Sequence, residues 1–321
     1  MSYQQQVEQH HRESYAADVQ MVAQQLRNPI RDMVTVVPAS GEAQTAAELI
    51  GEADYQKAGD RDRRNPDNRN NLSRRWLVRP QAIERGTYID KAEKFDLARD
   101  PTGEYMRNNV AAVERGWYDQ VLGVEKKTDG TFGVSGHGIY GSAQEGRRPG
   151  AKSDLPDGQY LAANYRLGGA SGAATGLTMD KLRRAKLVLN KAEFGLDPQF
   201  MDPMCGLIAP EQVDDLIGLA EQTKLNVNNF TVEQLVEGRP TKLLGFTWIA
   251  SNRVPYDSNG NRMIAFWGKS NIVAGEWQGI EGDMWNDSST KNLPYCYVSA
   301  YVDATRVQDK GVIIARCAEA G

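Results

Sequence analysis

The stretch that best indicates the fold is residues 57–79, which read KAGDRDRRNPDNRNNLSRRWLVR. It carries eight Lys or Arg against three Asp, a net charge of +5, whereas the whole chain has a formal net charge of −4. Sequence this polar cannot bury enough apolar surface to offset the entropy of ordering, yet patterned sequence follows it at once. We therefore expect a basic arm that projects from an acidic body and contacts a neighbouring copy of the chain.

Two alternatives to that interpretation stay open. A disordered surface loop fits the Asn, Asp, Gly and Pro of the stretch, although long structureless loops are uncommon within compact domains. An arm for nucleic acid fits the arginines, because guanidinium groups pair with phosphate. The interleaved Asp residues and the acidic charge of the whole chain weaken this last alternative.

The sequence on either side of the arm predicts strands. A β-prone run covers Met33–Val37, and two short strands follow the arm at Trp76–Val78 and Thr87–Asp90. The arm is therefore predicted to be an extended hairpin. Residues 1–27 are rich in Gln and Glu and predict an amphipathic helix that lies on a neighbour.

The strongest helix is predicted within RDPTGEYMRNNVAAVERGWYDQVLG, residues 99–123. Asp100 is a favourable N-cap, and Pro101 suits the first helical position. Gly123 offers a C-terminal stop. One apolar stripe runs along about six helical turns and consists of Met106, Val110, Val113, Trp117 and Val121.

The segment Thr128–Gly176 is dominated by Gly, Ser, Ala, Asp and Pro, so we expect loops and irregular strands. Within it, Gly136–Gly141 spells G-x-G-x-x-G, the pattern of a dinucleotide-binding turn. That turn requires a buried strand before it and a helix after it. Neither is predicted here, so a dinucleotide site is not expected.

The next part of the chain predicts a basic amphipathic helix, TMDKLRRAKLVLNKAEFG. Thr178 is its N-cap, and its inward side is expected to hold Leu182, Ala185, Leu189 and Ala192. The basic side chains are expected to point mostly outward, to solvent, to packaged nucleic acid or to an acidic neighbour. They are Lys181, Arg183, Arg184, Lys186 and Lys191.

A buried strand at Met204–Ala209 and a helix from Pro210 form a strand–helix unit, which predicts a second lobe. The acidic pair Asp214 and Asp215 is expected on the solvated side of that helix. A short helix and further strands complete the chain, at Val232–Glu237, residues 242–255, Arg262–Trp267, Pro294–Asp303 and Lys310–Cys317.

Length and composition limit the kinds of protein that this chain can be. With 321 residues and 40% hydrophobic residues, the chain can form two lobes or one body with extensions. No apolar run approaches the roughly 20 residues that span a bilayer, and the start lacks a signal peptide, so we expect no membrane partner. The three cysteines form no C-x-x-C pair, and His10 and His11 lack further ligands, so no disulfide, metal or cofactor is expected.

The sequence offers no convincing catalytic constellation. Glu281, Asp283 and Asp287 lie near Trp277 and Trp285, which is reminiscent of a carbohydrate site with two carboxylates. Nearby Gly and Asn residues, however, predict a turn of exposed acids, namely Gly279, Gly282 and Asn286. Because nothing else joins a nucleophile to a base, the chain is predicted not to be an enzyme.

The order of these elements resembles the major capsid proteins of tailed double-stranded DNA phages, whose HK97-like fold is also used by encapsulin shells. Four stretches are similar to one branch of that family: the helix at residues 99–123, GLTMDKLRRAKLVLNKAEF, CGLIAPEQVDDLIGLAEQ and GRPTKLLGFTWIASNRVP. The final DATRVQDKGVIIARCAEAG is also similar. The resemblance spans about residues 30 to 321 and implies an α+β fold.

The resemblance also implies a division of the chain. Residues 1–45 would be the N-arm and 46–90 the E-loop. The peripheral domain, with its long spine helix, would comprise 91–195 and 291–321, and the axial domain 196–290. The implied function is assembly into the pentamers and hexamers of an icosahedral head that encloses double-stranded DNA. An encapsulin-like compartment is the alternative within the fold, and a nucleic-acid-binding protein is the alternative outside it.

The implied partners are further copies of the chain, a separate scaffolding protein, a portal, a decoration protein and non-specifically packaged double-stranded DNA. Synthesis in the host bacterial cytoplasm and a final location in the virion follow from the same resemblance. Contacts between subunits are assigned to the arm and its base. The residues are Arg61, Arg63, Arg64, Arg74 and Arg75 for ion pairs, with Trp76 as an apolar anchor.

Overall fold

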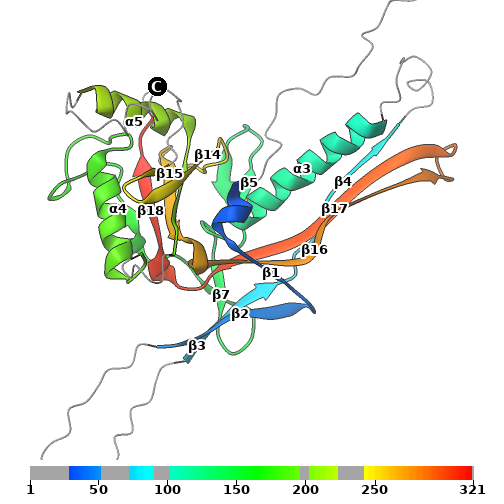
Figure 1. Cartoon of the computed structure of the whole chain (residues 1–321), viewed down its shortest axis with the longest axis horizontal. Coiled ribbons are helices and arrows are strands. Elements are labelled where there is room, and N and C mark those ends of the chain that lie inside the picture. Colours follow the sequence, from blue (N-terminus) through cyan, green and yellow to red (C-terminus); the bar gives the residue numbers. More distant parts are fainter. Residues whose placement is uncertain (1–28, 52–71, 90–101, 196–201, 223–241, 320–321) are drawn as a thin grey trace, which may run out of the picture. The chain divides into compact units, whose positions relative to one another are not determined.

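The computed structural model describes residues 29–51, 72–89, 102–195, 202–222 and 242–319 (Figure 1). The helices predicted within residues 1–27 and at 232–237 lie outside these ranges. By its internal contacts the described chain divides into two compact units. The first contains Ala82–Arg115 and Ile280–Ala300, and the second contains residues 29–81, Gly116–Gly279 and residues 301–319. The division into N-arm, E-loop, peripheral and axial parts stays a prediction.

The first unit is a helix packed on a sheet. Helix α3 (Thr102–Leu122) contributes its part up to Arg115, and the sheet consists of β4 (Ile83–Tyr88) with parts of β16 (Ile272–Asp287) and β17 (Leu293–Arg306). Apolar side chains of α3 and of the facing strands form its core because they recur at helical and strand spacing. The core comprises Val113, Val298 and Ala300, with Ile83, Met106, Val110 and Ile280 packed against it.

The register of β4 decides which side chains face the helix. β4 pairs antiparallel with β17, from Tyr295 opposite Tyr88 to Ala300 opposite Ile83. Thr87 donates its hydroxyl to Asn109 of α3 over 3.0 Å, so the side chains of Tyr88 and every second residue before it face away from the helix. The short strand predicted at residues 87–90 thus overlaps β4, whose partner is the C-terminal strand β17.

Helix α3 ends where its sequence predicts. It ends at Leu122, and Gly123 has φ +73°, a conformation that favours glycine. A Cβ at this position would also overlap the backbone of His137, so the glycine-rich segment lies directly against the end of the helix. Trp117 and Val121 of the predicted stripe are fully buried.

The second unit contains a six-stranded mixed sheet with the order β13-β14-β12-β15-β18-β9. Its central strands β12 and β15 are buried at every position, as was predicted for β12 from its apolar sequence. The strands are β9 (Tyr160–Leu161), β12 (Met204–Ile208), β13 (Lys242–Leu243), β14 (Phe246–Ala250), β15 (Arg262–Gly268) and β18 (Val312–Cys317). Helices α4 (Met179–Lys191) and α5 (Pro210–Gln222) belong to the same unit.

Helix α4 begins at the predicted N-cap, because the Thr178 hydroxyl accepts a hydrogen bond from the backbone of Lys181. Leu182, Ala185 and Leu189 are buried as predicted. The outward placement of Lys181 was wrong, since its side chain is fully buried. Its Nζ donates to the carbonyl oxygens of Thr175, Gly176 and Arg316 at 2.7, 2.8 and 2.9 Å, which replaces the hydration of the ammonium group.

The solvated placement of Asp215 in α5 was also wrong. Its carboxylate is partly buried and accepts a hydrogen bond from the backbone of Leu177 at 2.8 Å. Burial raises the pKa of Asp215, although the bond from Leu177 and the charge of Lys181 oppose that rise. Asp214 beside it is exposed, as expected. One member of the acidic pair therefore has a structural role that helix periodicity did not indicate.

A second sheet of this unit carries the hairpin that leads into the arm. Its order is β2-β3-β7-β8, with β2 (Ala43–Ile50), β3 (Leu72–Val78), β7 (Ala143–Glu145) and β8 (Ala151–Ser153). The glycine-rich segment otherwise forms short pairs, as predicted: β5 (Val124–Lys126) with β6 (Phe132–Val134), and β10 (Tyr165–Arg166) with β11 (Gly169–Ala170). The 3-10 turns are Pro29–Met33, Asp157–Gln159, Lys269–Asn271 and Asp309–Gly311, and β1 (Thr35–Pro38) pairs with the start of β16.

Candidate assembly surfaces

The arm leaves the body from the β2–β3 hairpin. The two strands pair antiparallel from Ala43 opposite Val78 to Ile50 opposite Leu72, and the chain between them is residues 51–71. Ile50 and Leu72 are 68% and 73% exposed, so two apolar side chains face solvent side by side where the described hairpin ends. An exposed apolar pair at such a position is typical of a surface that another chain covers.

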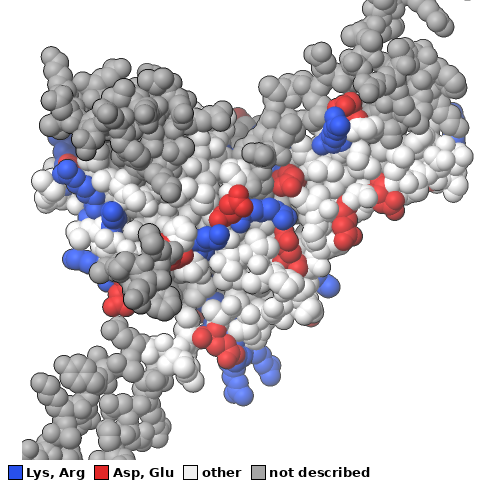
Figure 2. Space-filling model, viewed as in Figure 1, with Lys and Arg blue, Asp and Glu red and all other residues white. Residues whose placement is uncertain are grey.

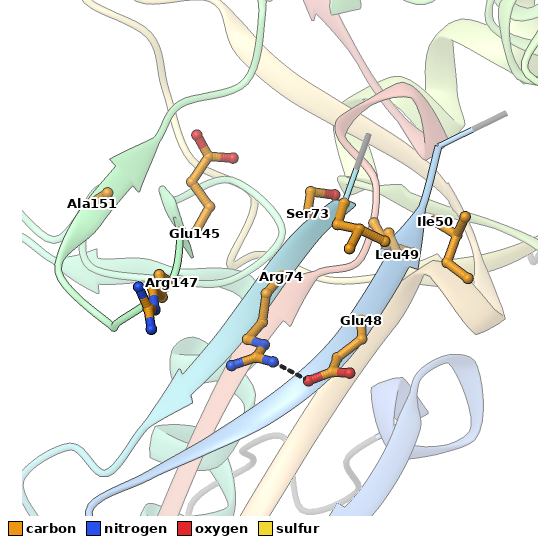
Figure 3. A pocket seen from close by; sticks show the side chains of 10 residues that line it. Glu48, Leu49, Ile50, Ser73, Arg74, Glu145, Arg147 and Ala151 are labelled. Carbon is orange, nitrogen blue, oxygen red and sulfur yellow. Dashed lines mark ion pairs between the residues drawn. The ribbon is translucent and has the colours of Figure 1, made fainter. Parts of the chain in front are cut away.

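A groove of about 770 Å³ lies at this end of the hairpin (Figure 3). Its rim is charged, and Arg74 forms an ion pair with Glu48 across the two strands at 2.5 Å. The residues that line it are Glu48, Leu49, Ile50, Leu72, Ser73, Arg74, Glu145, Gly146, Arg147 and Ala151. The groove thus combines apolar and charged groups of both signs.

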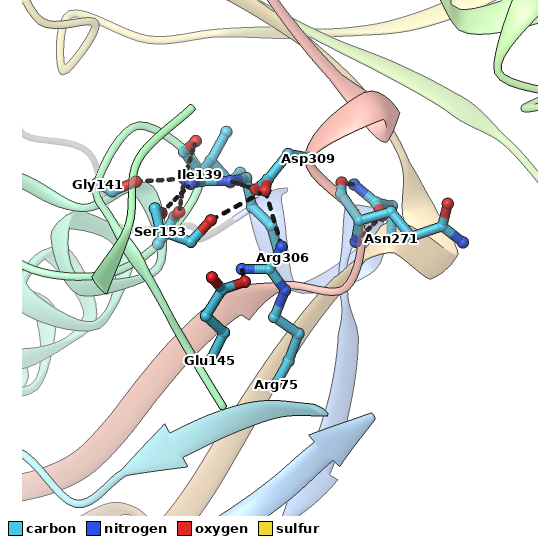
Figure 4. A network of polar contacts seen from close by, with 10 residues as sticks. Arg75, Ile139, Gly141, Glu145, Ser153, Asn271, Arg306 and Asp309 are labelled. Atoms are coloured by element: carbon cyan, nitrogen blue, oxygen red, sulfur yellow. Dashed lines mark hydrogen bonds and ion pairs between the residues drawn. The ribbon is translucent and has the colours of Figure 1, made fainter. Parts of the chain in front are cut away.

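A buried polar network fixes the middle of β3 (Figure 4). Arg75 is only 7% exposed, and its guanidinium binds Asp309 at 2.7 Å and Glu145 at 3.3 Å. Asp309 also accepts from Arg306 at 3.1 Å and from the hydroxyl of Ser153 at 3.2 Å. One carboxylate is therefore shared by two arginines, and it joins the base of the hairpin to the turn before β18.

Arg306 holds the glycine-rich segment against this network. It is fully buried and donates to the carbonyl oxygens of Gly138, Ile139, Gly141 and Ser153. Burial lowers the pKa of Arg306, while Asp309 opposes that effect. A guanidinium has five N–H donors and stays charged in proteins, which suits a site made mostly of carbonyl oxygens. Arg306 therefore binds the glycine-rich segment through its backbone. Because every residue has a carbonyl oxygen, no sequence motif indicates this contact.

The first unit has an acidic and aromatic sheet face on the side away from α3, which we call the acid–aromatic face. Strand alternation places Glu84 and Tyr88 of β4 there, together with Tyr295 and Tyr297 of β17. On β16, alternation from Ile280 in the core assigns it Glu281, Asp283, Trp285 and Asp287. None of these eight residues is basic.

The rings of this face pack against one another. Tyr295 lies 4.4 Å from Tyr88, 5.1 Å from Trp285 and 6.4 Å from Tyr297, measured between ring centroids. Tyr295 covers Gly86, where any side chain would overlap its hydroxyl. Tyr88 and Trp285 are nevertheless 46% and 44% exposed. An ordered aromatic cluster that keeps this much surface in water is a candidate contact for another chain.

Hydrogen bonds from tyrosine hydroxyls orient two carboxylates of this face. Tyr88 donates to Asp287 at 2.8 Å, and Tyr297 donates to Glu84 at 2.7 Å. Hydrogen bonds from Ser289 and Tyr88 lower the pKa of Asp287, and the bond to Asp287 raises the pKa of Tyr88. The face therefore presents fixed negative charge next to aromatic rings, which together attract cations.

The turn predicted around residues 279–287 was wrong, although Glu281 and Asp283 are exposed as expected. These residues lie within β16, one uninterrupted strand of 16 residues. Gly282 does not bend the chain. A Cβ at Gly282 would lie 3.2 Å from Met106 Sδ of α3, so the glycine permits close approach of the helix.

The structure describes only some of the residues that the sequence analysis assigned to contacts between subunits. Arg61, Arg63 and Arg64 lie outside the described residues. Arg74 pairs with Glu48 and also lies over the ring of Trp76, 5.3 Å from its centroid. Arg75 has the two carboxylate partners described above, and the Trp76 indole donates to the Gly146 carbonyl at 2.9 Å. These last three therefore have partners within the chain, and their role between subunits stays a prediction.

Sequence reasoning missed the acid–aromatic face and the Arg306 network. Alternating Tyr295 and Tyr297 were a visible signal for the face, but the predicted turn separated them from Trp285. The three thiols are free and buried, as expected, and burial raises the pKa of Cys205 and Cys317 to about 12. Within the described residues, no group of His, Cys, Asp and Glu is arranged to hold a metal ion. No described helix has the length and apolarity to cross a bilayer.

A family model for phage capsid proteins matches residues 7–319, nearly the whole chain. The chain belongs to the phage capsid protein family. It is therefore a structural protein of the virion that forms a shell, and the compartment and nucleic-acid-binding alternatives are not favoured. No curated protein matches this capsid protein in sequence.

Solved structures agree with this membership. The capsid of Ralstonia phage GP4 matches with a TM-score of 0.67 at 12% identity, covering 97% of this chain and 96% of that one. The capsid of a native GTA particle matches with a TM-score of 0.65 at 13% identity, covering 97% and 96%. The capsid of Cyanophage P-SCSP1u gives 0.65 at 12% identity, covering 98% and 95%. At such low identity these likenesses establish the HK97-like fold alone.

Proposed function

We propose that this capsid protein builds the pentamers and hexamers of an icosahedral head, and that the basic arm of one subunit binds the acid–aromatic face of the next. The observation that carries the second part is charge complementarity. Arg61, Arg63 and Arg64 lie in a segment that cannot form a core of its own. The acid–aromatic face offers carboxylates beside exposed rings, the surroundings in which arginine binds most strongly.

Rings of five and six subunits need a contact that tolerates small changes of angle. An extended arm meets that need because it binds by side chains and does not require one rigid docking of two bodies. The contact is heterologous, since the arm and the face are different surfaces of the same chain, and such contacts close into rings. The proposal also includes the partners and properties that the resemblance to capsid proteins implies: a separate scaffolding protein, a portal, a decoration protein, enclosed double-stranded DNA, synthesis in the host cytoplasm and no enzymatic activity.

Charge exchange between the two surfaces tests the proposal. One variant reverses the arm with Arg61→Glu, Arg63→Glu and Arg64→Glu, and a second reverses the face with Glu281→Lys and Asp283→Lys. Each alone should reduce the yield of closed shells at least about tenfold, since several like charges would then be brought together. Combined in one chain, they should restore a large part of that yield. Shells are counted by negative-stain electron microscopy and light scattering.

A matched control keeps this test specific. Lys126→Glu, Lys127→Glu and Arg148→Glu reverse three exposed positive charges elsewhere and should leave shell formation unchanged. If the combined variant assembles no better than either single set, the proposed contact is wrong. If the wild-type protein forms no shells or rings with or without its scaffolding protein, the proposal of an icosahedral head fails as a whole.

A further inference from the structure

The outer side of helix α4 carries basic side chains that have no carboxylate partner within the described residues. Arg183 and Lys191 are exposed, and Arg184 and Lys186 are half-buried. Many other arginines of the described chain are paired, among them Arg31, Arg74, Arg75, Arg107, Arg253, Arg262, Arg306 and Arg316. The positive charge of α4 is thus not neutralised by an ion pair with any described residue.

The basic side chains of α4 have two kinds of surroundings. Lys181 turns inward and gives its three hydrogen bonds to backbone carbonyl oxygens. The four outward cations receive no such compensation. Asp180 is the only acidic residue of α4, and its carboxylate accepts a hydrogen bond from the backbone of Leu167 at 3.1 Å. The outward side therefore has a local positive charge on a chain whose formal net charge is −4.

The spacing of these cations suits a polyanion. Arg183 and Lys191 are eight residues apart, about 12 Å along the helix axis. Figure 2 shows Lys and Arg following one another along the edge that α4 occupies in Figure 1. Arg166 is exposed on the β10–β11 hairpin, which the Leu167–Asp180 bond ties to the first turn of α4. Duplex DNA carries about one negative charge per 1.7 Å, so several phosphates fall within this length.

We propose that the outward side of α4 binds the phosphate backbone of duplex DNA without sequence preference. This inference rests on the proposed function, a head that encloses DNA. It names the residues that would contact this DNA, which membership of the family does not identify. Phosphate binding is favoured by cations that reach solvent and lack a carboxylate partner, and Arg183 and Lys191 of α4 meet both conditions among the described residues. An acidic protein partner is the competing occupant, because Leu187 is 45% exposed and Leu167 is 81% exposed beside the cations.

The test measures binding of a mixed-sequence duplex of about 20 base pairs to unassembled full-length subunits, as a function of salt. The variant carries Arg183→Gln, Lys186→Gln and Lys191→Gln. Arg184 is left unchanged, so that the variant and the control below each lose three cations. The variant should bind at least about tenfold more weakly, and the slope of log affinity against log salt should fall in magnitude by about 2 to 3. A control with Arg147→Gln, Arg148→Gln and Lys152→Gln removes three exposed cations elsewhere and should change both quantities less.

Thermal unfolding of both variants shows whether each is folded. Equal binding by the α4 variant, the control and the wild type overturns the inference. So does an α4 variant that binds DNA normally but no longer associates with the scaffolding protein, because the occupant would then be a protein. A second measurement compares particles with and without DNA: amine acetylation of Lys186 and Lys191 should decrease when DNA is present. Equal labelling in the two kinds of particle counts against the inference.

These outcomes separate the inference from the proposed function. Wild-type subunits that assemble into shells while the α4 variant keeps its DNA affinity would refute only the role of α4. Wild-type subunits that never form shells would refute the proposed head, whatever the DNA measurement gives.

Discussion

Individual charged residues hold this protein together at sites where burial alone would be unfavourable. Lys181, Arg306 and Arg75 are all buried, and each is compensated by a different set of acceptors. Lys181 uses carbonyl oxygens alone, Arg306 adds Asp309, and Arg75 uses two carboxylates. Because removing one member of such a set leaves buried polar groups unpaired, these residues should be the most sensitive to substitution.

Lys181→Met should reduce the free energy of unfolding by about 2–4 kcal/mol, since three carbonyl oxygens lose a charged donor. Denaturant unfolding of isolated subunits measures the change. The control is Lys191→Met on the same helix, whose side chain is exposed and which should change stability by less than about 0.5 kcal/mol. If both substitutions change the free energy of unfolding equally, the carbonyl contacts of Lys181 do not stabilise the fold.

Glu319 should give the protein a specific sensitivity to acid. Burial alone would raise its pKa, but hydrogen bonds from Arg262 and Tyr256, at 2.5 and 2.8 Å, lower it below its ordinary value of 4.5. A carboxyl whose folded pKa is lowered stabilises the fold above its unfolded pKa and loses that contribution as pH falls through the folded one. Unfolding free energy should therefore fall below about pH 4.5.

Glu319→Gln should remove part of that dependence and flatten the curve of unfolding free energy against pH. The exposed Glu125→Gln is the control and should leave the slope unchanged. A Glu319→Gln variant with the wild-type slope would mean that the ion pair with Arg262 does not persist in solution.

At the scale of elements, the β2–β3 hairpin is the part most dependent on a few contacts. The middle of β3 is held by Arg75, and its last residue, Val78, donates from its backbone to the buried Asp303 at 2.8 Å. The other end carries the exposed pair Ile50 and Leu72 and continues into the arm. The hairpin thus has a fixed base and a free end, as an extension that binds a neighbour requires.

Arg75→Met should destabilise the hairpin base by about 3–5 kcal/mol, because Asp309 and Glu145 would lose a buried counter-charge. Hydrogen exchange at the amides of β2 and β3 should accelerate more than exchange in β12 or β15. Arg74→Met removes the neighbouring ion pair, whose members are both substantially exposed, and should cost less than about 1 kcal/mol. Similar exchange rates in both variants would contradict the anchoring role of Arg75.

Elements with local signals were predictable, and those defined by distant partners were not. Helix α3 was predicted to its final residue because its apolar stripe and Gly123 are both local. The partner of strand β4 was not predicted, because β17 lies about 200 residues later in the sequence. The long strand β16 was interrupted in the prediction because Gly282 indicates a bend locally, while its actual reason is the approach of Met106 from α3.

The candidate surfaces were predictable only in part for the same reason. The charge of the arm is a property of consecutive residues, so the sequence showed it directly. The acid–aromatic face combines three strands, and the network around Arg306 depends on carbonyl oxygens, which every residue has. Inward Lys181 and outward Lys191 look alike in the sequence, and only packing against the C-terminal strand distinguishes them.

At the scale of the whole molecule, the charge distribution should make electrostatic attraction contribute to the rate of assembly. The net charge of +5 on residues 57–79 and −4 on the whole chain means that copies attract through unlike regions. Screening acts over about 10 Å at 0.1 M salt, so this attraction should depend on ionic strength.

The initial rate of assembly, followed by light scattering, should fall as salt rises from about 0.05 to 0.5 M. A variant with Arg61→Ser, Arg63→Ser and Arg64→Ser should assemble slowly at every salt concentration and should show a weaker dependence. Assembly that accelerates with salt in the wild type would indicate that apolar contacts, such as those of Ile50 and Leu72, control the rate instead.

The half-exposed indole of Trp285 gives the protein an optical label of its own. Indole emission shifts to shorter wavelength when water leaves its surroundings, and Trp117 and Trp267, which are fully buried, already emit from a dry environment. A neighbour that covers the acid–aromatic face would change the colour of Trp285 and leave those two unaltered. The formation of the contact at the acid–aromatic face could then be followed by tryptophan fluorescence during assembly, before closed shells form and without an added label.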